Sequence, residues 1–109
     1  MDWTAQLRRG ILELCVLGII RQGPIYGYAL VSRLAQWDVL AVSEGTLYPL
    51  LRRLGNEGLI EATWQESDAG PVRKYYRLLP SGAEWLETME AGWGLLVGSV
   101  EQILAKRSE

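Results

Sequence analysis

Two β-rich runs joined by a turn interrupt a chain whose other segments repeat their apolar residues with helical spacing, and this feature limits the possible folds most. Residues 59–66 and 72–79 are rich in β-branched and aromatic residues, and residues 67–71 between them (SDAGP) have the composition of a turn. The runs predict an antiparallel β-hairpin. Because three helical segments precede the hairpin and one follows it, the chain is expected to be mainly α-helical with one small β element.

Three helices are predicted before the hairpin. Residues 3–21 carry two apolar stripes, and residues 26–37 resume helical spacing after a Gln-Gly-Pro stop. Residues 43–57 place leucines on one side of a third helix, for which Ser43 is a suitable N-cap. Pro49 lies too deep for an undisturbed helix that begins directly after this cap. The third helix is therefore expected either to be kinked or to start later.

The segment after the hairpin predicts a long helix with an uncovered apolar stripe. Ser81 is the expected cap, and Glu84 completes a capping box three residues later. Apolar residues then recur in steps of three and four, which is the spacing of a helix that packs along another helix. The stripe consists of Leu86, Met89, Trp93, Leu96, Val100 and Ile103. One chain leaves much of this stripe uncovered, so we expect a partner helix from a second copy.

The predicted order is three helices, two strands and a final helix, with a short connection between the second and third helices. This is the plan of a winged helix-turn-helix (H-H-H-E-E) followed by a C-terminal dimerisation helix. Residues 1–80 are expected to form the winged helix-turn-helix DNA-binding domain. Residues 81–109 are expected to form the dimerisation helix, and the two parts to pack as one compact unit.

Composition restricts the classes of function. The longest apolar stretch, residues 11–20, is interrupted by Glu13 and is about half as long as a membrane helix. The N-terminal residues do not resemble a secretory signal, so we expect a cytoplasmic protein with no membrane partner. Histidine is absent and Cys15 is the single cysteine. Since these residues assemble neither a nucleophile–base pair nor a metal cluster, we expect no enzyme, no cofactor and no metal site.

Charge is distributed unevenly along the chain. The formal net charge of −2 does not by itself suggest nucleic acid, because Lys and Arg supply the affinity for phosphate. Residues 1–80, however, carry nine Lys and Arg against eight Asp and Glu, whereas residues 81–109 carry two against five. The acidic excess therefore belongs to the last helix.

The third helix and the hairpin expose groups that suit a DNA groove. Hydroxyls donate to phosphates or base edges, and guanidinium groups pair bidentately with phosphate or guanine. Cations on the hairpin can lie against the sugar-phosphate backbone. The alternative is an ordinary solvated face. The predicted DNA-binding residues are Ser43, Glu44, Thr46, Tyr48, Arg52, Arg53, Arg73 and Lys74.

Several separately spaced motifs resemble those of one known family. They are GPIYGY at residues 23–28, GTLYP at 45–49, GLI at 58–60 and GPVRKYY at 70–76. In these residues the chain resembles the PadR-like transcriptional regulators, and in particular short members with a single C-terminal helix, similar to multidrug-binding PadR-like repressors. The resemblance implies a homodimer formed by the first and last helices. It also implies repression of nearby genes that a small molecule relieves.

The resemblance gives Trp93 a possible role, because the matching tryptophan of multidrug-binding relatives stacks flat aromatic ligands against its dimer mate. Gly92, Gly94 and Gly98 surround Trp93 here, although each glycine costs about 1 kcal/mol in a helix interior. Two interpretations stay open: a slot for a small aromatic effector, or plain packing of two close helices. The residues expected at this effector pocket or dimer interface are Leu7, Ile11, Leu14, Trp85, Leu86, Met89, Trp93, Leu96 and Val100.

Two functions are consistent with these patterns. The leading hypothesis is a ligand-responsive dimeric repressor that binds double-stranded DNA at a palindromic operator. The alternative is a winged-helix module that binds a protein or a small molecule without reading DNA, which the acidic overall charge mildly favours. A steep loss of DNA binding with rising salt would support the first hypothesis.

Overall fold

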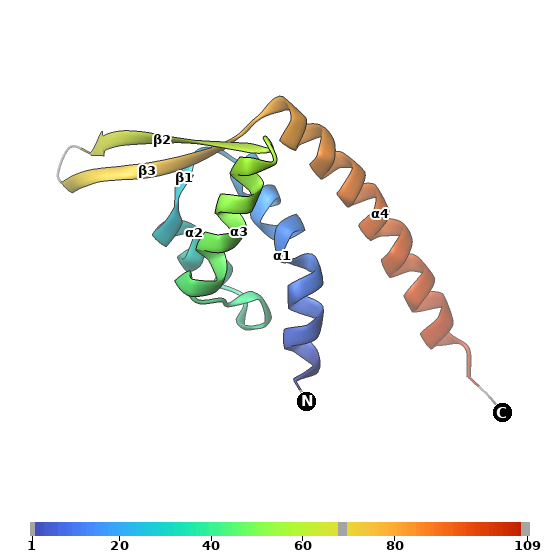
Figure 1. Ribbon diagram of the computed structural model, residues 1–109. Helices are drawn as coiled ribbons and strands as arrows, with labels where there is room; N and C mark the ends of the chain where they lie inside the picture. The colour runs from blue at the N-terminus through green and yellow to red at the C-terminus, as the bar shows by residue number, and fades with distance from the viewer. Residues whose placement is uncertain (1, 68–69, 108–109) are drawn as a thin grey trace.

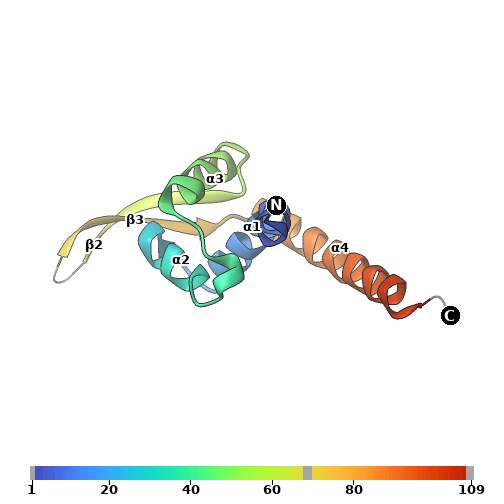
Figure 2. The same cartoon turned by 90° about the horizontal axis from the view of Figure 1, so that it is seen from below.

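The computed structural model describes residues 2–67 and 70–107 and confirms the predicted winged-helix architecture with a long C-terminal helix (Figure 1). The hairpin and α4 extend in opposite directions from the helical body, so the molecule is elongated, with extents of 64 × 30 × 21 Å (Figure 2). In chain order the elements are α1 (Trp3–Arg21), β1 (Ile25–Tyr26), α2 (Gly27–Leu34), the 3-10 turn η1 (Asp38–Leu40), α3 (Glu44–Asn56), β2 (Ile60–Ser67), β3 (Gly70–Leu78) and α4 (Pro80–Ala105).

The sheet has three antiparallel strands in the order β1-β3-β2, one more than predicted. The additional strand is β1, whose Ile25 and Tyr26 pair with Tyr76 and Tyr75 of β3. Two residues are too few to show the alternation by which a strand is recognised in a sequence. Because these residues are extended, α2 begins at Gly27 and is shorter at both ends than the predicted helix.

The predicted hairpin is confirmed, and its register determines which side chains share a face. Ile60, Ala62 and Trp64 of β2 lie opposite Leu78, Tyr76 and Lys74 of β3. Directly opposed residues point to the same side of a sheet, so these six side chains share one face. Ile60 and Tyr76 are buried, whereas Trp64 and Lys74, nearer the tip, are exposed. This face therefore changes from core to surface towards the tip, where residues 68–69 of the predicted turn lie outside the described residues.

The start of α3 is determined by the predicted cap. The Ser43 hydroxyl accepts a hydrogen bond from the backbone N–H of Thr46 at 3.3 Å, and α3 begins at Glu44. Pro49 therefore lies inside the helix, and the predicted alternative of a later start is wrong. Proline removes one backbone donor, so the carbonyl of Gly45, four residues earlier, loses its helical partner. Pro49 and Gly45 are both exposed, so this carbonyl is open to water.

The chain reverses sharply after α3. Gly58 has a φ of 77°, a left-handed conformation that glycine adopts without steric cost. The N–H of Leu59 donates to the carbonyl of Leu54 at 3.0 Å, and the N–H of Gly58 donates to that of Gly55 at 3.1 Å, which is the hydrogen-bond pattern of a Schellman motif. The reversal brings the chain back beneath α3 as β2.

The start of α4 packs against the same chain reversal. Its N-cap residue differs from the predicted one. The helix begins at Pro80, where a missing N–H costs nothing, and Leu79 is its N-cap without a side-chain bond. The expected cap at Ser81 is wrong, because the Ser81 hydroxyl instead donates to the carbonyl of Gly58. A Cβ at Gly82 would overlap the carbonyl of Leu59. The first turn of α4 therefore packs directly on the backbone that follows α3.

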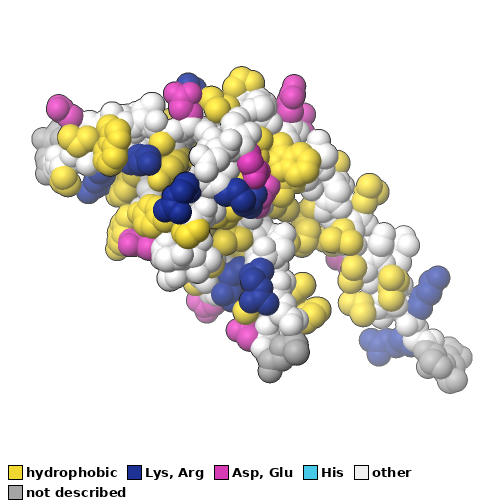
Figure 3. Space-filling view, viewed as in Figure 1, with side chains coloured by type: hydrophobic (Ala, Val, Ile, Leu, Met, Phe, Trp, Pro, Cys, Tyr) yellow, Lys and Arg dark blue, Asp and Glu magenta, His cyan; other side chains and the backbone are white. Residues whose placement is uncertain are grey.

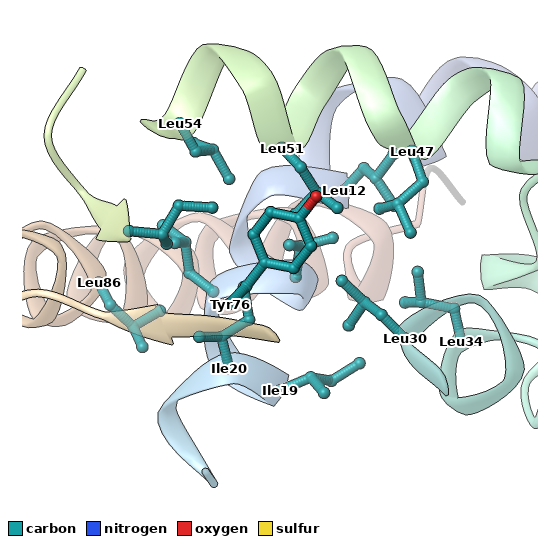
Figure 4. Close-up of a cluster of buried hydrophobic side chains, with 13 residues drawn as sticks. Leu12, Ile19, Ile20, Leu30, Leu34, Leu47, Leu51, Leu54, Tyr76 and Leu86 are labelled. Atoms are coloured by element: carbon teal, nitrogen blue, oxygen red, sulfur yellow. The ribbon is translucent and has the colours of Figure 1, made fainter. Parts of the chain in front are cut away.

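The hydrophobic core holds α3 against the rest of the body (Figure 4). Leu47, Leu51 and Leu54 of α3 are at most 1% exposed, and the ring of Tyr76 lies among them. Fully burying such side chains stabilises a fold by about 1.5–3 kcal/mol each. The remaining core residues are Leu12, Val16, Leu17, Ile19, Ile20, Leu30, Leu34, Ile60 and Leu86. This packing fixes the polar face of α3 outward.

Most of α4 projects away from this core. Among its described residues only Gly82 and Leu86 are buried. Leu95, Ile103 and Leu104 are 77%, 70% and 70% exposed, so much apolar surface is uncovered in a single chain. Across the described ranges, no helix has both the length and the apolar character that crossing a membrane requires.

Candidate nucleic-acid interface

The outer face of α3 carries most of the side chains that were predicted to bind DNA. Ser43, Glu44, Thr46, Tyr48, Arg52 and Arg53 are all exposed, at the cap or along the helix. Lys and Arg side chains gather on this face over α3, over the hairpin and between α3 and the first half of α1 (Figure 3). Whether each cation can bind a ligand depends on whether a neighbouring group already neutralises its charge.

Arg53 is already paired. Its Nη2 lies 2.6 Å from Oε1 of Glu13 on α1, and its Nη1 lies 2.9 Å from Oε2 of Glu57. The hydrogen bonds to Glu13 and then to Glu57 raise the pKa of the Arg53 guanidinium further above its ordinary value. The position of Arg53 therefore favours a role in tying α3 to α1.

Glu13 connects three helices, and it was not among the predicted site residues. Besides accepting from Arg53, its carboxylate accepts a hydrogen bond from the indole nitrogen of Trp85 on α4 at 2.8 Å. A carboxylate that interrupts the otherwise apolar residues 11–20 was the signal that could have identified it. Arg53 and Trp85, which were predicted for two different sites, thus share one carboxylate.

Arg52 is available to a ligand. In the part of the chain that the structure describes, it forms no ion pair with a carboxylate. It lines a groove of about 350 Å³ between α3 and the sheet, together with Tyr48, Lys74 and Tyr76. Burial raises the pKa of the Tyr76 hydroxyl, so it stays protonated near neutral pH and can donate a hydrogen bond. Guanidinium, ammonium and phenol groups in one groove suit a phosphate or a base edge.

The two predicted cations of the hairpin rest on aromatic rings. The guanidinium carbon of Arg73 lies 4.4 Å from the centre of the Tyr26 ring, and Nζ of Lys74 lies 6.0 Å from that of Trp64. Such contacts hold a cation in place without neutralising it. The groove that these four residues border measures about 510 Å³, and its other lining residues are Gly27, Tyr28, Tyr48, Val72 and Tyr76.

The aromatic part of this groove was missing from the predicted site. Tyr28 and Trp64 are 62% and 69% exposed, which is unusual for such large rings. The signal for Trp64 was its place opposite Lys74 in the hairpin. Tyr48, which was predicted, packs on the first residue of α2, because a Cβ at Gly27 would come within 2.6 Å of the Tyr48 ring. Helices α2 and α3 and the hairpin thus form one continuous surface.

A separate, apolar groove lies between α1 and α4. It measures about 200 Å³, and its lining includes Ile11, Leu14, Met89, Trp93 and Leu96, five of the residues predicted for the effector pocket or dimer interface. The other predicted residues lie outside its lining. Leu86 is part of the core, Trp85 bonds to Glu13, and Leu7 and Val100 are exposed on α1 and α4.

The order of elements agrees with a comparison against known families. The family model described as "Transcriptional regulator PadR-like family" matches residues 16–88, from the second half of α1 to the first turns of α4. This chain belongs to the PadR-like family of transcriptional regulators. The resemblance inferred from the motifs is therefore confirmed.

PadR-like proteins of known structure are similar to this chain over almost its whole length. A PadR-like transcriptional regulator from Bacillus cereus is 42% identical, with a TM-score of 0.87 over 94% of this chain and 99% of that one. A PadR family regulator from Eggerthella lenta is 40% identical, with a TM-score of 0.83 over 94% and 89%. An uncharacterised protein from Lysinibacillus sphaericus is 30% identical over 87 residues, which are 78% of this chain and 80% of that protein.

Members of the PadR-like family are transcriptional regulators and not enzymes. Within residues 2–67 and 70–107, no group of three or more His, Cys, Asp or Glu side chains is arranged to hold a metal ion. Burial raises the pKa of the Cys15 thiol, which favours the protonated form over the reactive thiolate. The grooves beside α3 are therefore interpreted as binding surfaces.

Proposed function

We propose that this PadR-like chain acts in the cytoplasm as a dimeric repressor that binds double-stranded DNA at a palindromic operator. The observation that carries the proposal is the surface of α3 and the hairpin, where Arg52, Arg73 and Lys74 have no carboxylate partner among the described residues. Uncompensated Lys and Arg on one face supply the affinity of proteins for DNA phosphates. The net negative charge of the whole chain does not oppose this, because residues 1–80, which include this surface, carry nine Lys and Arg against eight Asp and Glu.

The proposed roles follow from the position of each side chain. With α3 in the major groove, Ser43, Thr46, Tyr48 and Arg52 face the base edges, and Glu44 can accept a hydrogen bond from a cytosine amino group. Arg73 and Lys74 contact the adjacent sugar-phosphate backbone from the hairpin. Arg53 positions α3 through Glu13 and is not proposed to read bases.

Dimerisation is proposed through the apolar stripe of α4. Trp93, Leu96, Val100 and Ile103 are between 42% and 70% exposed in the single chain, and they follow the heptad spacing of paired helices. An uncovered apolar surface of this kind is typical of an interface. Two copies related by a two-fold axis present two α3 helices, which is why the operator is proposed to be palindromic.

A small aromatic molecule is proposed to modulate DNA binding from the groove at Trp93. The groove of about 200 Å³ is smaller than the ~300–1,000 Å³ of most ligand pockets. A second copy of α4 packed across it would enlarge the enclosed space and add a second indole ring. Flat apolar ligands would then stack between the two rings.

DNA binding can be tested with one double variant and a matched control. Fluorescence anisotropy would use a duplex that the wild-type protein selects from a random pool. Arg52→Ala with Lys74→Ala is expected to weaken binding about 10- to 100-fold. Arg77→Ala is the control, because Arg77 also lies on β3 but pairs with Glu61 at 3.0 Å, and it is expected to bind nearly as the wild type does.

Either of two results would contradict the proposal. One is unchanged binding by the double variant at physiological salt. The other is wild-type binding that does not weaken as salt rises, which would favour the winged-helix module that does not read DNA.

The effector groove has its own test. A planar aromatic cation is expected to quench tryptophan fluorescence in the wild type, and Trp93→Phe is expected to remove most of this quenching. Trp37→Phe is the matched control, because Trp37 is 50% exposed and Trp93 is 42% exposed. Quenching that persists in Trp93→Phe would show that the ligand binds elsewhere.

A further inference from the structure

A fourth groove lies on the side of α3 that faces away from the hairpin. It measures about 320 Å³ and is formed by the first half of α1 and the start of α3. Arg8 and Arg9 line it from α1, and Ser43 and Thr46 line it from the beginning of α3. Neither arginine was among the predicted site residues, because α1 was predicted only as a core and dimer helix.

The charge in this groove is positive and uncompensated. In the part of the chain that the structure describes, neither arginine is ion-paired with a carboxylate, and no acidic side chain lines the groove. Three other arginines of the chain, Arg21, Arg53 and Arg77, do form such pairs. The groove at Arg8 and Arg9 therefore belongs with Arg52 and the hairpin cations as a site that can receive an anion.

Arg8 is held in position for this purpose. Its Nε donates a hydrogen bond to the backbone carbonyl of Val39 at 2.8 Å, across a separation of 31 residues. This bond uses one of the five donors of the guanidinium and leaves the two terminal nitrogens for a ligand. Arg8 is half-buried and Arg9 is exposed, so one side chain is pre-positioned and the other is free to adapt.

The location of the groove indicates which anion it meets. A duplex that holds a helix in its major groove presents one phosphate backbone along each rim of that groove, about 12 Å apart. The hairpin cations Arg73 and Lys74 lie on one side of α3. Arg8 and Arg9 lie on the other side, next to Thr46, and Figure 3 shows Lys and Arg side chains on both sides of α3.

We propose that Arg8 and Arg9 bind a DNA phosphate on the rim of the major groove opposite the rim that the hairpin contacts. The inference rests on the proposed function, because it requires α3 to enter the groove. It assigns α1 a direct role in DNA binding. The contact is to the backbone, so it strengthens binding to every sequence and holds α3 at a fixed depth and orientation.

The salt dependence of binding provides the test. The double variant Arg8→Ala with Arg9→Ala would be titrated by anisotropy against two duplexes: the one selected by the wild-type protein and a scrambled duplex of the same composition. Salt would be varied between about 50 and 200 mM. The expected result is equal weakening on both duplexes. The slope of log K against log salt is expected to fall by about 0.9 for each phosphate that the variant no longer neutralises.

Two further variants separate a specific contact from a general loss of charge. Lys106→Ala with Arg107→Ala removes the same charge beyond the end of α4 and is expected to leave the slope unchanged. Arg8→Lys with Arg9→Lys keeps the charge and is expected to restore most of the slope. Circular dichroism melting of each variant would verify that it is folded.

The possible outcomes distinguish this inference from the function on which it rests. If the wild-type protein binds DNA and the Arg8 and Arg9 double variant has the same salt slope as the wild type, this inference alone is overturned. Weakening confined to the selected duplex would also overturn it, because a phosphate contact carries no sequence preference. No wild-type binding to any duplex would overturn the proposed function and this inference together.

Discussion

Helices α3 and α4 both carry leucines and an apolar stripe, but their leucines differ sharply in burial. Leu47, Leu51 and Leu54 of α3 are at most 1% exposed, whereas Leu95 and Leu96 of α4 are 77% and 59% exposed. The apolar face of α3 is covered within its own chain, and its outer face is polar. Among the described residues, most of the apolar side chains of α4 are exposed. The same residue type therefore contributes to folding in one helix, whereas in the other it stays exposed on the helix that is proposed to dimerise.

The largest expected effect comes from a leucine of α3. Leu54→Ala removes a fully buried side chain and leaves a cavity, which is expected to lower the free energy of unfolding by about 2–5 kcal/mol. Leu95→Ala on α4 is the matched variant and is expected to change it by less than about 0.5 kcal/mol. Urea denaturation of both proteins measures the difference. Equal losses would contradict the division between the two helices.

A smaller effect is expected from a charge placed on α4. Leu96→Glu puts a carboxylate on the proposed dimer stripe, and it is expected to weaken dimerisation about 100-fold, or ~2.7 kcal/mol. Leu95→Glu is the control, because Leu95 is more exposed but lies off the stripe. Sedimentation equilibrium across protein concentrations measures both. If Leu95→Glu weakened assembly as much as Leu96→Glu, the stripe would not be the interface.

The link between the two helices gives a third comparison. Glu13→Gln replaces the carboxylate that joins Arg53 of α3 to Trp85 of α4, and the expected loss of unfolding free energy is about 0.5–1.5 kcal/mol. Glu57→Gln removes the other partner of Arg53, a more exposed one at i,i+4 spacing, and is expected to cost about 0.3–0.5 kcal/mol. Denaturation at low and high salt compares the two. A larger cost for Glu57→Gln would show that Glu13 does not link the helices.

The smallest expected effect concerns pH. Burial raises the pKa of the Tyr76 hydroxyl above its ordinary value of 10.0. The stability that this group contributes is therefore complete below about pH 10 and is lost as pH rises through its higher native pKa. Unfolding free energies of the wild type and Tyr76→Phe would be compared between pH 8 and about pH 11. A gap between the two proteins that does not change above about pH 10 would contradict the expected linkage.

The parts of the fold that the sequence predicted are those with long and regular patterns. The helix over residues 3–21, the cap at Ser43 and the hairpin depend on neighbours in the sequence, so spacing alone revealed them. Strand β1 was missed because it has two residues, and the cap at Ser81 was wrong because its hydroxyl bonds to a loop 23 residues away.

The candidate site shows the same limit. Spacing on the outer face of α3 identified exposed residues, but the exposure of Arg53 did not indicate that Glu13, 40 positions away, neutralises it. Arg8 was missed for a similar reason, because its position beside α3 depends on tertiary packing. Which of these residues touch DNA, and which touch a second chain, stays a prediction.

The anchored start of α4 has a geometric consequence. The first turn packs on the Leu59 carbonyl at Gly82, and the whole helix is 26 residues long. At 1.5 Å per residue α4 is about 39 Å long, so a change of about 5° in its direction at this anchor moves its far end by roughly 3 Å. A small change in direction at the turn after α3 is therefore amplified along the length of α4. A side chain added at Gly82 would alter the spacing of any assembly built on α4 while leaving every residue on the outer face of α3 unchanged.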